Sequence, residues 1–192
     1  MLIIDMISCW DFPDADRLLP EARRITRPIA ALAARCRRAS VPVVYANDNR
    51  GQWRSDFAAL VEVSLAAGGA PREITEALRP DPHDFFVLKP KQSAFFGTPL
   101  ELLLQHLDVG RLILTGVSSD QCVLTLAIEA RMRDLDVVVP RDCSATQTVG
   151  RHAAVVRQLR ETHKVPVVTG SRILLQQSGR RAVSRVTTTD RE

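Results

Sequence analysis

The 192-residue chain lacks the features that mark exported and membrane proteins. It begins at once with a strand-like segment, MLIID, and no basic region followed by an apolar leader comes before it. No apolar run is long enough to cross a bilayer. We therefore expect a cytoplasmic protein that has no membrane partner.

Motifs for metals, cofactors and disulfides are missing as well. The chain has no C-x-x-C pair, no G-x-G-x-x-G after its first strand and no phosphate-binding G-x-x-x-x-G-K-[ST] loop. Its histidines show no H-x-H or H-x-x-x-H spacing of the kind that binds metals. None of them lies in a motif at the end of a strand, so the sequence does not indicate a Cys–His dyad. We expect no metal and no cofactor, and we expect four free thiols, at Cys9, Cys36, Cys122 and Cys143.

The chain carries a net charge of +4 and has a pI near 9.2, a balance that is compatible with nucleic-acid binding. However, its arginines are scattered over helical segments, with acidic residues spread between them, and no aromatic–basic platform or recognition motif is present. The basic balance therefore indicates a solvated surface, and no nucleic-acid partner is expected.

Short β-branched segments alternate with longer segments that have helical periodicity. This alternation predicts one α/β domain over residues 1–175, with a mainly parallel sheet between two layers of helices. Pro28 predicts a kink or a late start of the first helix. Residues 176–192 lose periodicity and are expected to be mobile or to lie across a partner subunit. The expected strands are 2–5, 41–46, 85–88, 111–117, 136–140 and 165–170, and the expected helices are 19–38, 71–79, 98–107, 150–163 and the segment that holds Cys122.

Asp5 ends the first strand, where an unpaired buried charge would be costly. It could cap a neighbouring turn. It also lies at the carboxyl end of a parallel strand, where the reactive groups of such sheets collect. Both interpretations remain open from position alone.

Lysine is rare in this chain and is concentrated in one place. Of the three lysines, Lys89 and Lys91 lie in a single loop after the third strand, and Pro90 stiffens the backbone between them. An ammonium group is a compact charge that can approach a carboxylate and a thiolate together. The alternative is a pair of solvated loop lysines.

Cys122 lies where the apolar segment RLILTGV passes into a helix, and SSDQ offers an N-cap with a Ser-x-x-Gln capping box. The unpaired N–H groups of a first helical turn favour a thiolate and can hold an oxyanion. This position predicts a Cys122 pKa below the usual value of about 8.5 and fast labelling by iodoacetamide. The alternative is an inert buried cysteine.

Four aromatic residues follow expected strands and could line a small apolar cleft above Cys122. Packing within the helical layers is the other interpretation for each of them. These residues are Trp10, Phe12, Trp53 and Phe95.

Three segments, LIIDM, LKPKQSAFFGTPL and LTGVSSDQCVLTLA, occur in this order. With them the chain resembles the isochorismatase-like cysteine hydrolases from its first strand to about VPVVTG. The resemblance implies a three-layer αβα, Rossmann-like fold with a six-stranded parallel sheet and an Asp5–Lys89–Cys122 triad. It also implies a cis peptide between Val117 and Ser118, which would turn the Ser118 N–H toward the substrate beside that of Cys122.

The chain departs from the family pattern in two places. ISCWDF follows the first aspartate where many members have an asparagine-rich stretch. YANDNRGQWRSDF contains no histidine, whereas the nicotinamidase branch has a metal site in this region, so a metal-free branch is indicated.

The resemblance leads us to expect a homo-oligomer (dimer or tetramer) that acts on a small-molecule substrate and cleaves the C–N bond of a small amide or carbamoyl compound through a thioester. One alternative is vinyl ether hydrolysis with Asp5 as the acid and no use of the thiol. The other is a binding or scaffold protein without activity.

Overall fold

The computed structural model describes residues 1–51, 53 and 56–175. Within them, seven strands form one parallel sheet of order β3-β2-β1-β4-β5-β7, with β6 paired to β4. The strands are β1 (Leu2–Ile4), β2 (Val44–Asp48), β3 (Phe85–Lys89), β4 (Arg111–Val117), β5 (Asp136–Pro140), β6 (Ser144–Ala145) and β7 (Val167–Val168). All six expected strands are present, and the two-residue β6 is an addition.

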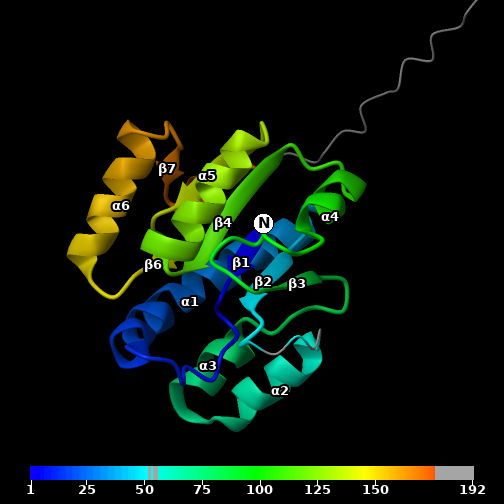
Figure 1. Ribbon diagram of the computed structural model, residues 1–192, viewed down its shortest axis with the longest axis vertical. Helices are drawn as coiled ribbons and strands as arrows, with labels where there is room; N and C mark the ends of the chain where they lie inside the picture. The colour runs from blue at the N-terminus through cyan, green and yellow to red at the C-terminus, as the bar shows by residue number, and fades with distance from the viewer. Residues whose placement is uncertain (52, 54–55, 176–192) are drawn as a thin grey trace, which may run out of the picture.

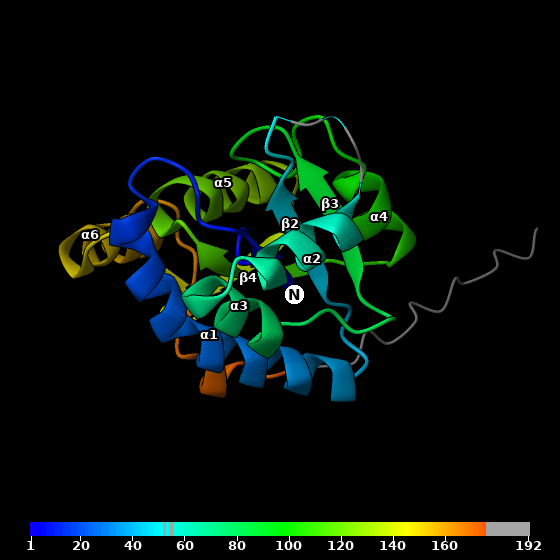
Figure 2. The same ribbon diagram turned by 90° about the horizontal axis from the view of Figure 1, so that it is seen from below.

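Helices cover both faces of this sheet, as the view in Figure 2 shows, so the expected three-layer α/β fold is confirmed. The helices are α1 (Ala15–Arg38), α2 (Phe57–Ala66), α3 (Gly69–Ala77), α4 (Leu100–His106), α5 (Leu124–Met132) and α6 (Val149–Glu161). A π-helical turn, η1 (Ser119–Val123), precedes α5, and a 3₁₀ turn, η2 (Gly170–Arg172), follows β7. The expected tail, residues 176–192, lies outside the described residues.

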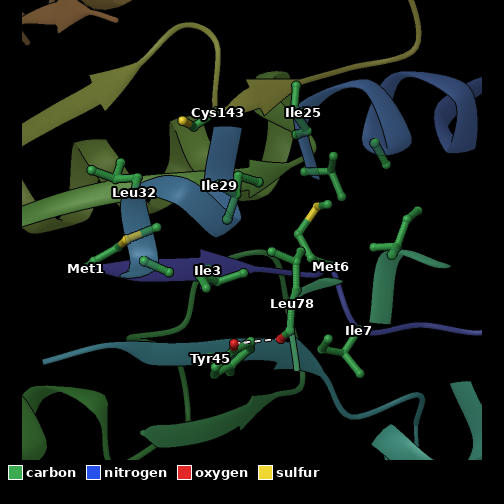
Figure 3. Packing of buried hydrophobic residues seen from close by; sticks show 14 of the residues in the cluster. Met1, Ile3, Met6, Ile7, Ile25, Ile29, Leu32, Tyr45, Leu78 and Cys143 are labelled. Atoms are coloured by element: carbon green, nitrogen blue, oxygen red, sulfur yellow. Dashed lines mark hydrogen bonds between the residues drawn. The ribbon is translucent and has the colours of Figure 1, made fainter. Parts of the chain in front are cut away.

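The buried side chains form one cluster on each face of the sheet. The first joins α1, α2 and α3 to the sheet, and the second joins α4, α5 and α6 to its other face. Figure 3 shows part of the first cluster, with Ile29 and Leu32 of α1 above the strand that holds Ile3. The Tyr45 hydroxyl donates a 2.7 Å hydrogen bond to the Leu78 carbonyl.

The structure corrects the boundaries of the first helix. α1 begins at Ala15, earlier than expected, and continues through both Pro20 and Pro28. A proline inside a helix costs about 3 kcal/mol. The apolar stripe that α1 buries against the sheet offsets this cost, because burying one large aliphatic side chain contributes about 1.5–3 kcal/mol. The prediction that the first helix starts late, near Pro28, was therefore wrong.

Candidate active site

Three parallel strands deliver the candidate residues to one edge of the sheet. Asp5 directly follows β1, Lys89 is the last residue of β3, and Cys122 lies in η1 after β4. β1 lies between β2 and β4, and β3 is the other neighbour of β2. Figure 1 shows these strands side by side in the sheet. Since parallel strands end at the same edge, residues more than 30 positions apart in sequence meet there.

Lys89 connects the other two residues. Its Nζ lies 2.8 Å from Asp5 Oδ2, 3.5 Å from Cys122 Sγ and 3.3 Å from the Lys91 carbonyl oxygen. An ammonium group has three N–H donors, and here each of them has an acceptor. The side chain is only 1% exposed, so it is held in place and is not a solvated loop lysine.

Asp5 is fixed through both of its carboxylate oxygens. Oδ2 pairs with Lys89, while Oδ1 accepts a 2.8 Å hydrogen bond from the Asp48 N–H at the end of β2. The Asp5 backbone is left-handed, with φ of 52°, and its N–H still bonds the Ala46 carbonyl at 3.0 Å. The carboxylate therefore holds the end of β2 and at the same time faces Lys89 and Cys122.

Gly116 brings the end of β4 close to β1. It pairs with Ile4 in the parallel register, and a Cβ placed on it would lie 2.1 Å from the Ile4 carbonyl oxygen. Its φ of 102° is also one that other residues rarely adopt. One residue further along, the peptide bond between Val117 and Ser118 is cis, at the position that the resemblance implied.

The turn that carries Cys122 differs from the one expected. η1 is π-helical, and the Ser118 carbonyl accepts from the N–H groups of both Gln121 and Val123, each at 3.2 Å. The expected capping box is absent, because the Ser118 side chain makes no capping hydrogen bond to η1 and interacts with Asp120 instead. A π-turn of this kind is often found at functional sites.

The electrostatics of the site correct the expected thiolate. Burial, the Asp5 carboxylate and its hydrogen bond raise the pKa of Cys122 to about 12, although Lys89 acts in the opposite direction. Burial also raises the pKa of Asp5, and Lys89 offsets only part of this effect. Burial alone would lower the pKa of Lys89, but Asp5 and Cys122 outweigh it and raise that pKa. At rest the site therefore holds a thiol, and the expectation of a lowered Cys122 pKa was wrong.

This protonation state predicts slow labelling of Cys122 at neutral pH. With a pKa of about 12, and allowing for the greater nucleophilicity of a basic thiolate, we expect carbamidomethylation at pH 8 to be roughly 10- to 100-fold slower than that of free cysteine. The rate should rise with pH up to the region of the thiol pKa. Iodoacetamide treatment followed by peptide mapping measures Cys122 separately from the other thiols.

Two variants should shift this rate in opposite directions. Asp5→Asn removes the carboxylate that raises the thiol pKa, so labelling at neutral pH should become faster. Lys89→Met removes the cation that lowers it, so labelling should become slower. Equal rates in the wild type and both variants would show that the three groups are not coupled.

A cavity of about 640 Å³ opens above these residues and is lined by Asp5, Lys89, Ser118 and Cys122 among others. One wall is apolar and is formed by residues from the β1–α1 segment, α1 and α2. The lining contains acidic and basic side chains: Asp11 pairs with Arg50, and Asp48 and Lys91 also border the cavity. A small molecule with one apolar portion and polar groups fits this lining.

Of the four aromatic residues expected at the cavity, only Phe12 lines it within the described part of the chain. Trp10 belongs to the core cluster under α1, and its ring centroid lies 5.8 Å from that of Phe12. Phe95 packs into the cluster on the other face, with the Arg133 guanidinium 4.2 Å above its ring. Trp53 is 80% exposed. The loops that hold these residues follow strands, but their side chains turn into the helical layers or outward.

Sequence reasoning missed two polar residues at the cavity. Asn47 is 2% exposed, donates a 2.7 Å hydrogen bond to the Ile7 carbonyl, and has no partner for Oδ1 among the described residues. Arg50 pairs with Asp11 and lies 3.0 Å from Cys9 Sγ. Both residues follow the second expected strand closely. That strand ends at the same edge of the sheet as the candidate residues, so this position in the sequence could have identified them.

The described residues contain neither a metal-binding cluster nor a membrane-spanning helix. Across residues 1–51, 53 and 56–175, no group of three or more His, Cys, Asp or Glu side chains is arranged to hold a metal ion. No helix in the described ranges combines the length and the apolar character needed to cross a membrane.

The isochorismatase domain matches residues 1–171 of the chain. The isochorismatase family protein YaaI of Bacillus subtilis is 32% identical over 148 residues, which is 77% of this chain and 81% of that protein. Ureidoacrylate amidohydrolase RutB of Enterobacter sp. is 39% identical over 70 residues, 36% of this chain and 28% of RutB. The crystal structure of N-carbamoylsarcosine amidase from Thermoplasma acidophilum superposes with a TM-score of 0.69, at 23% identity, over 90% of this chain and 96% of that one.

A match over residues 1–171 covers most of the chain, and the fold agrees with it. The chain therefore belongs to the isochorismatase family of hydrolases.

Proposed function

We propose that this protein hydrolyses the C–N bond of a small amide or carbamoyl compound, with Cys122 as the nucleophile. The observation that carries the proposal is the position of Lys89 Nζ, 2.8 Å from Asp5 Oδ2 and 3.5 Å from Cys122 Sγ, beside a cavity of substrate size. A carboxylate and a thiol that both contact one buried ammonium have the composition of a nucleophile activated by an adjacent base.

The first step is a proton exchange inside the site. Asp5 takes the thiol proton from Cys122, and the negative charge moves from the carboxylate to the sulfur. Lys89 contacts both groups, so the cation pairs with the negative charge before and after the transfer. Burial disfavours each anion separately, but the exchange leaves the net charge of the site unchanged. A high pKa at both Asp5 and Cys122 is thus compatible with the transfer.

The thiolate then attacks the substrate carbonyl. The N–H groups of Ser118 and Cys122, two residues that border the cavity, stabilise the oxyanion, and one such donor contributes about 3–4 kcal/mol to lowering the barrier. Protonated Asp5 gives its proton to the leaving amine, which produces a thioester at Cys122. Asp5 next activates a water molecule, and hydrolysis of the thioester restores the thiol.

Two of the similar proteins support C–N bond cleavage in particular. RutB is named as an amidohydrolase of ureidoacrylate, and the Thermoplasma acidophilum protein as an amidase of N-carbamoylsarcosine. Both names describe ureido or carbamoyl substrates. The apolar wall and the charged lining of the cavity suit a compound of this kind with a short apolar portion.

The test is a panel of primary amides, ureido acids and N-carbamoyl amino acids, incubated with the full chain while ammonia release is measured. We expect turnover of at least one compound by the wild type and none by Cys122→Ala. Turnover of isochorismate that survives in Cys122→Ala would favour vinyl ether hydrolysis. Tight binding of panel compounds without any product would favour a binding protein. Either outcome would overturn the proposal.

A further inference from the structure

The turn that carries Cys122 is tied to helix α6 through the half-buried side chain of His152. His152, in the first turn of α6, places Nδ1 3.0 Å from the Ser119 hydroxyl and Nε2 3.1 Å from the Arg141 carbonyl oxygen. Ser119 is only 1% exposed and directly follows Ser118, whose N–H is one of the two proposed oxyanion donors. The imidazole therefore connects the end of β5 to the turn of the active site.

The two contacts fix the tautomer of His152. A carbonyl oxygen can only accept a hydrogen bond, so Nε2 carries the proton and donates it to Arg141. In the neutral ring Nδ1 then has a free lone pair, and it accepts from the Ser119 hydroxyl. This chain of hydrogen bonds sets the direction of the Ser119 O–H.

A second contact ties the same turn to the same region. Asp120 accepts a 2.6 Å hydrogen bond from the Thr146 hydroxyl and pairs with Arg151, the neighbour of His152 in α6. Two consecutive residues of η1 are thus held by side chains outside the turn. Neither contact reaches the cavity, because His152 and Arg151 are absent from its lining in the described part of the chain.

We propose that His152, as a neutral imidazole, positions the Ser118–Cys122 turn for oxyanion binding by accepting the Ser119 hydroxyl hydrogen bond. This inference rests on the proposed function. His152 is a positioning residue, since it acts through Ser119 and touches neither the thiol nor the cavity. Histidine suits the position because one ring can accept from Ser119 and donate to Arg141 at once.

The surroundings keep the ring neutral. Burial lowers the pKa of His152, and Arg24 lowers it further, while the Arg141 carbonyl, Glu21 and Asp120 act in the opposite direction. Glu21 and Arg24 face the ring from α1, Asp120 faces it from η1, and Arg151 adjoins it in α6. Protonation would place an N–H on Nδ1, and the Ser119 hydroxyl could then no longer donate to it.

The kinetic test uses p-nitrophenyl acetate, an ester whose hydrolysis would pass through the same oxyanion and a thioester at Cys122. His152→Phe removes both contacts and should lower kcat about 10- to 100-fold with KM changed less than about threefold. His152→Asn keeps an acceptor near the position of Nδ1 and should recover most of the lost kcat. His106→Phe, at the exposed end of α4, is the matched control and should behave as the wild type.

A double-mutant cycle shows whether His152 acts through Ser119. Ser119→Ala removes the other end of the same hydrogen bond, so the double variant His152→Phe/Ser119→Ala should be no slower than the slower single variant. An unchanged kcat in His152→Phe, equal losses in the Asn and Phe variants, or additive losses in the cycle would each overturn the proposal.

Two readouts do not require turnover. Carbamidomethylation of Cys122 should be faster in His152→Phe than in the wild type, because the turn is no longer held, and unchanged in His152→Asn. Nitrogen-15 NMR of the wild type at pH 7 should show the Nε2–H tautomer for His152. Failure of the wild type to hydrolyse the ester would count against the proposed function, and these readouts would then decide the role of His152. An Nδ1–H tautomer, or equal labelling rates in all variants, would contradict it.

Discussion

Replacing Asp5 with asparagine is expected to lower kcat/KM for the amide identified in the panel by at least about 10³-fold, because the site loses the carboxylate that accepts the thiol proton. The fold should persist. Asparagine Oδ1 can still accept the hydrogen bond from the Asp48 N–H. Lys89 keeps a counter-ion as well, because the thiolate of Cys122, 3.5 Å away, becomes easier to form when the carboxylate is gone.

Asp136→Asn is the matched control, since Asp136 forms an exposed ion pair with Arg111 at the opposite end of the sheet. It should change kcat/KM by less than about twofold. Circular dichroism and a thermal melt separate the two roles of Asp5. An Asp5→Asn protein that is unfolded, or one that retains turnover, would show that Asp5 only holds the end of β2 and that the triad assignment fails.

The second large effect concerns stability. Gly116→Ala should lower the free energy of unfolding by about 3 kcal/mol or more, since the new methyl group would overlap the Ile4 backbone and the residue would keep an unfavourable φ of 102°. The Ile4 backbone belongs to the central strand β1, which cannot move without breaking its pairing to β2 and β4. Urea denaturation followed by circular dichroism measures the change.

Gly150→Ala provides the control. Gly150 lies in α6, and no heavy atom would lie within 4 Å of an added Cβ. Alanine is favoured over glycine inside a helix, so this variant should be unchanged or more stable by up to about 1 kcal/mol. A Gly116→Ala protein as stable as the wild type would mean that β4 and β1 are not packed this closely beside Asp5.

The sequence predicted the parts of this protein that follow from periodicity and strand order. Each of the six apolar β-branched segments overlaps a strand of the sheet, as expected for apolar strands buried between two layers of helices. The meeting of Asp5, Lys89 and Cys122 was foreseen for a similar reason. Residues after parallel strands share one edge, and the family resemblance implied a triad of these three residues.

Features that depend on three-dimensional burial were not predicted. The helical position of Cys122 indicated a lowered pKa, but its enclosure beside Asp5 raises it, and sequence spacing contains no measure of that enclosure. The side chains of Trp10 and Phe95 turn into the core instead of the cavity for a similar reason. Helix α2 escaped notice because FAALVEVSLA has no clear apolar stripe.

If Cys122 is the nucleophile, it becomes acylated during turnover. The most direct measurement is mass spectrometry of the wild type, acid-quenched during steady-state hydrolysis of the amide identified in the panel. We predict a mass increase equal to one acyl group, located by peptide mapping on Cys122, released by hydroxylamine and absent from Cys122→Ala. Steady turnover with no adduct on Cys122, in a protein whose Cys122→Ala variant remains active, would show that Cys122 is not the nucleophile.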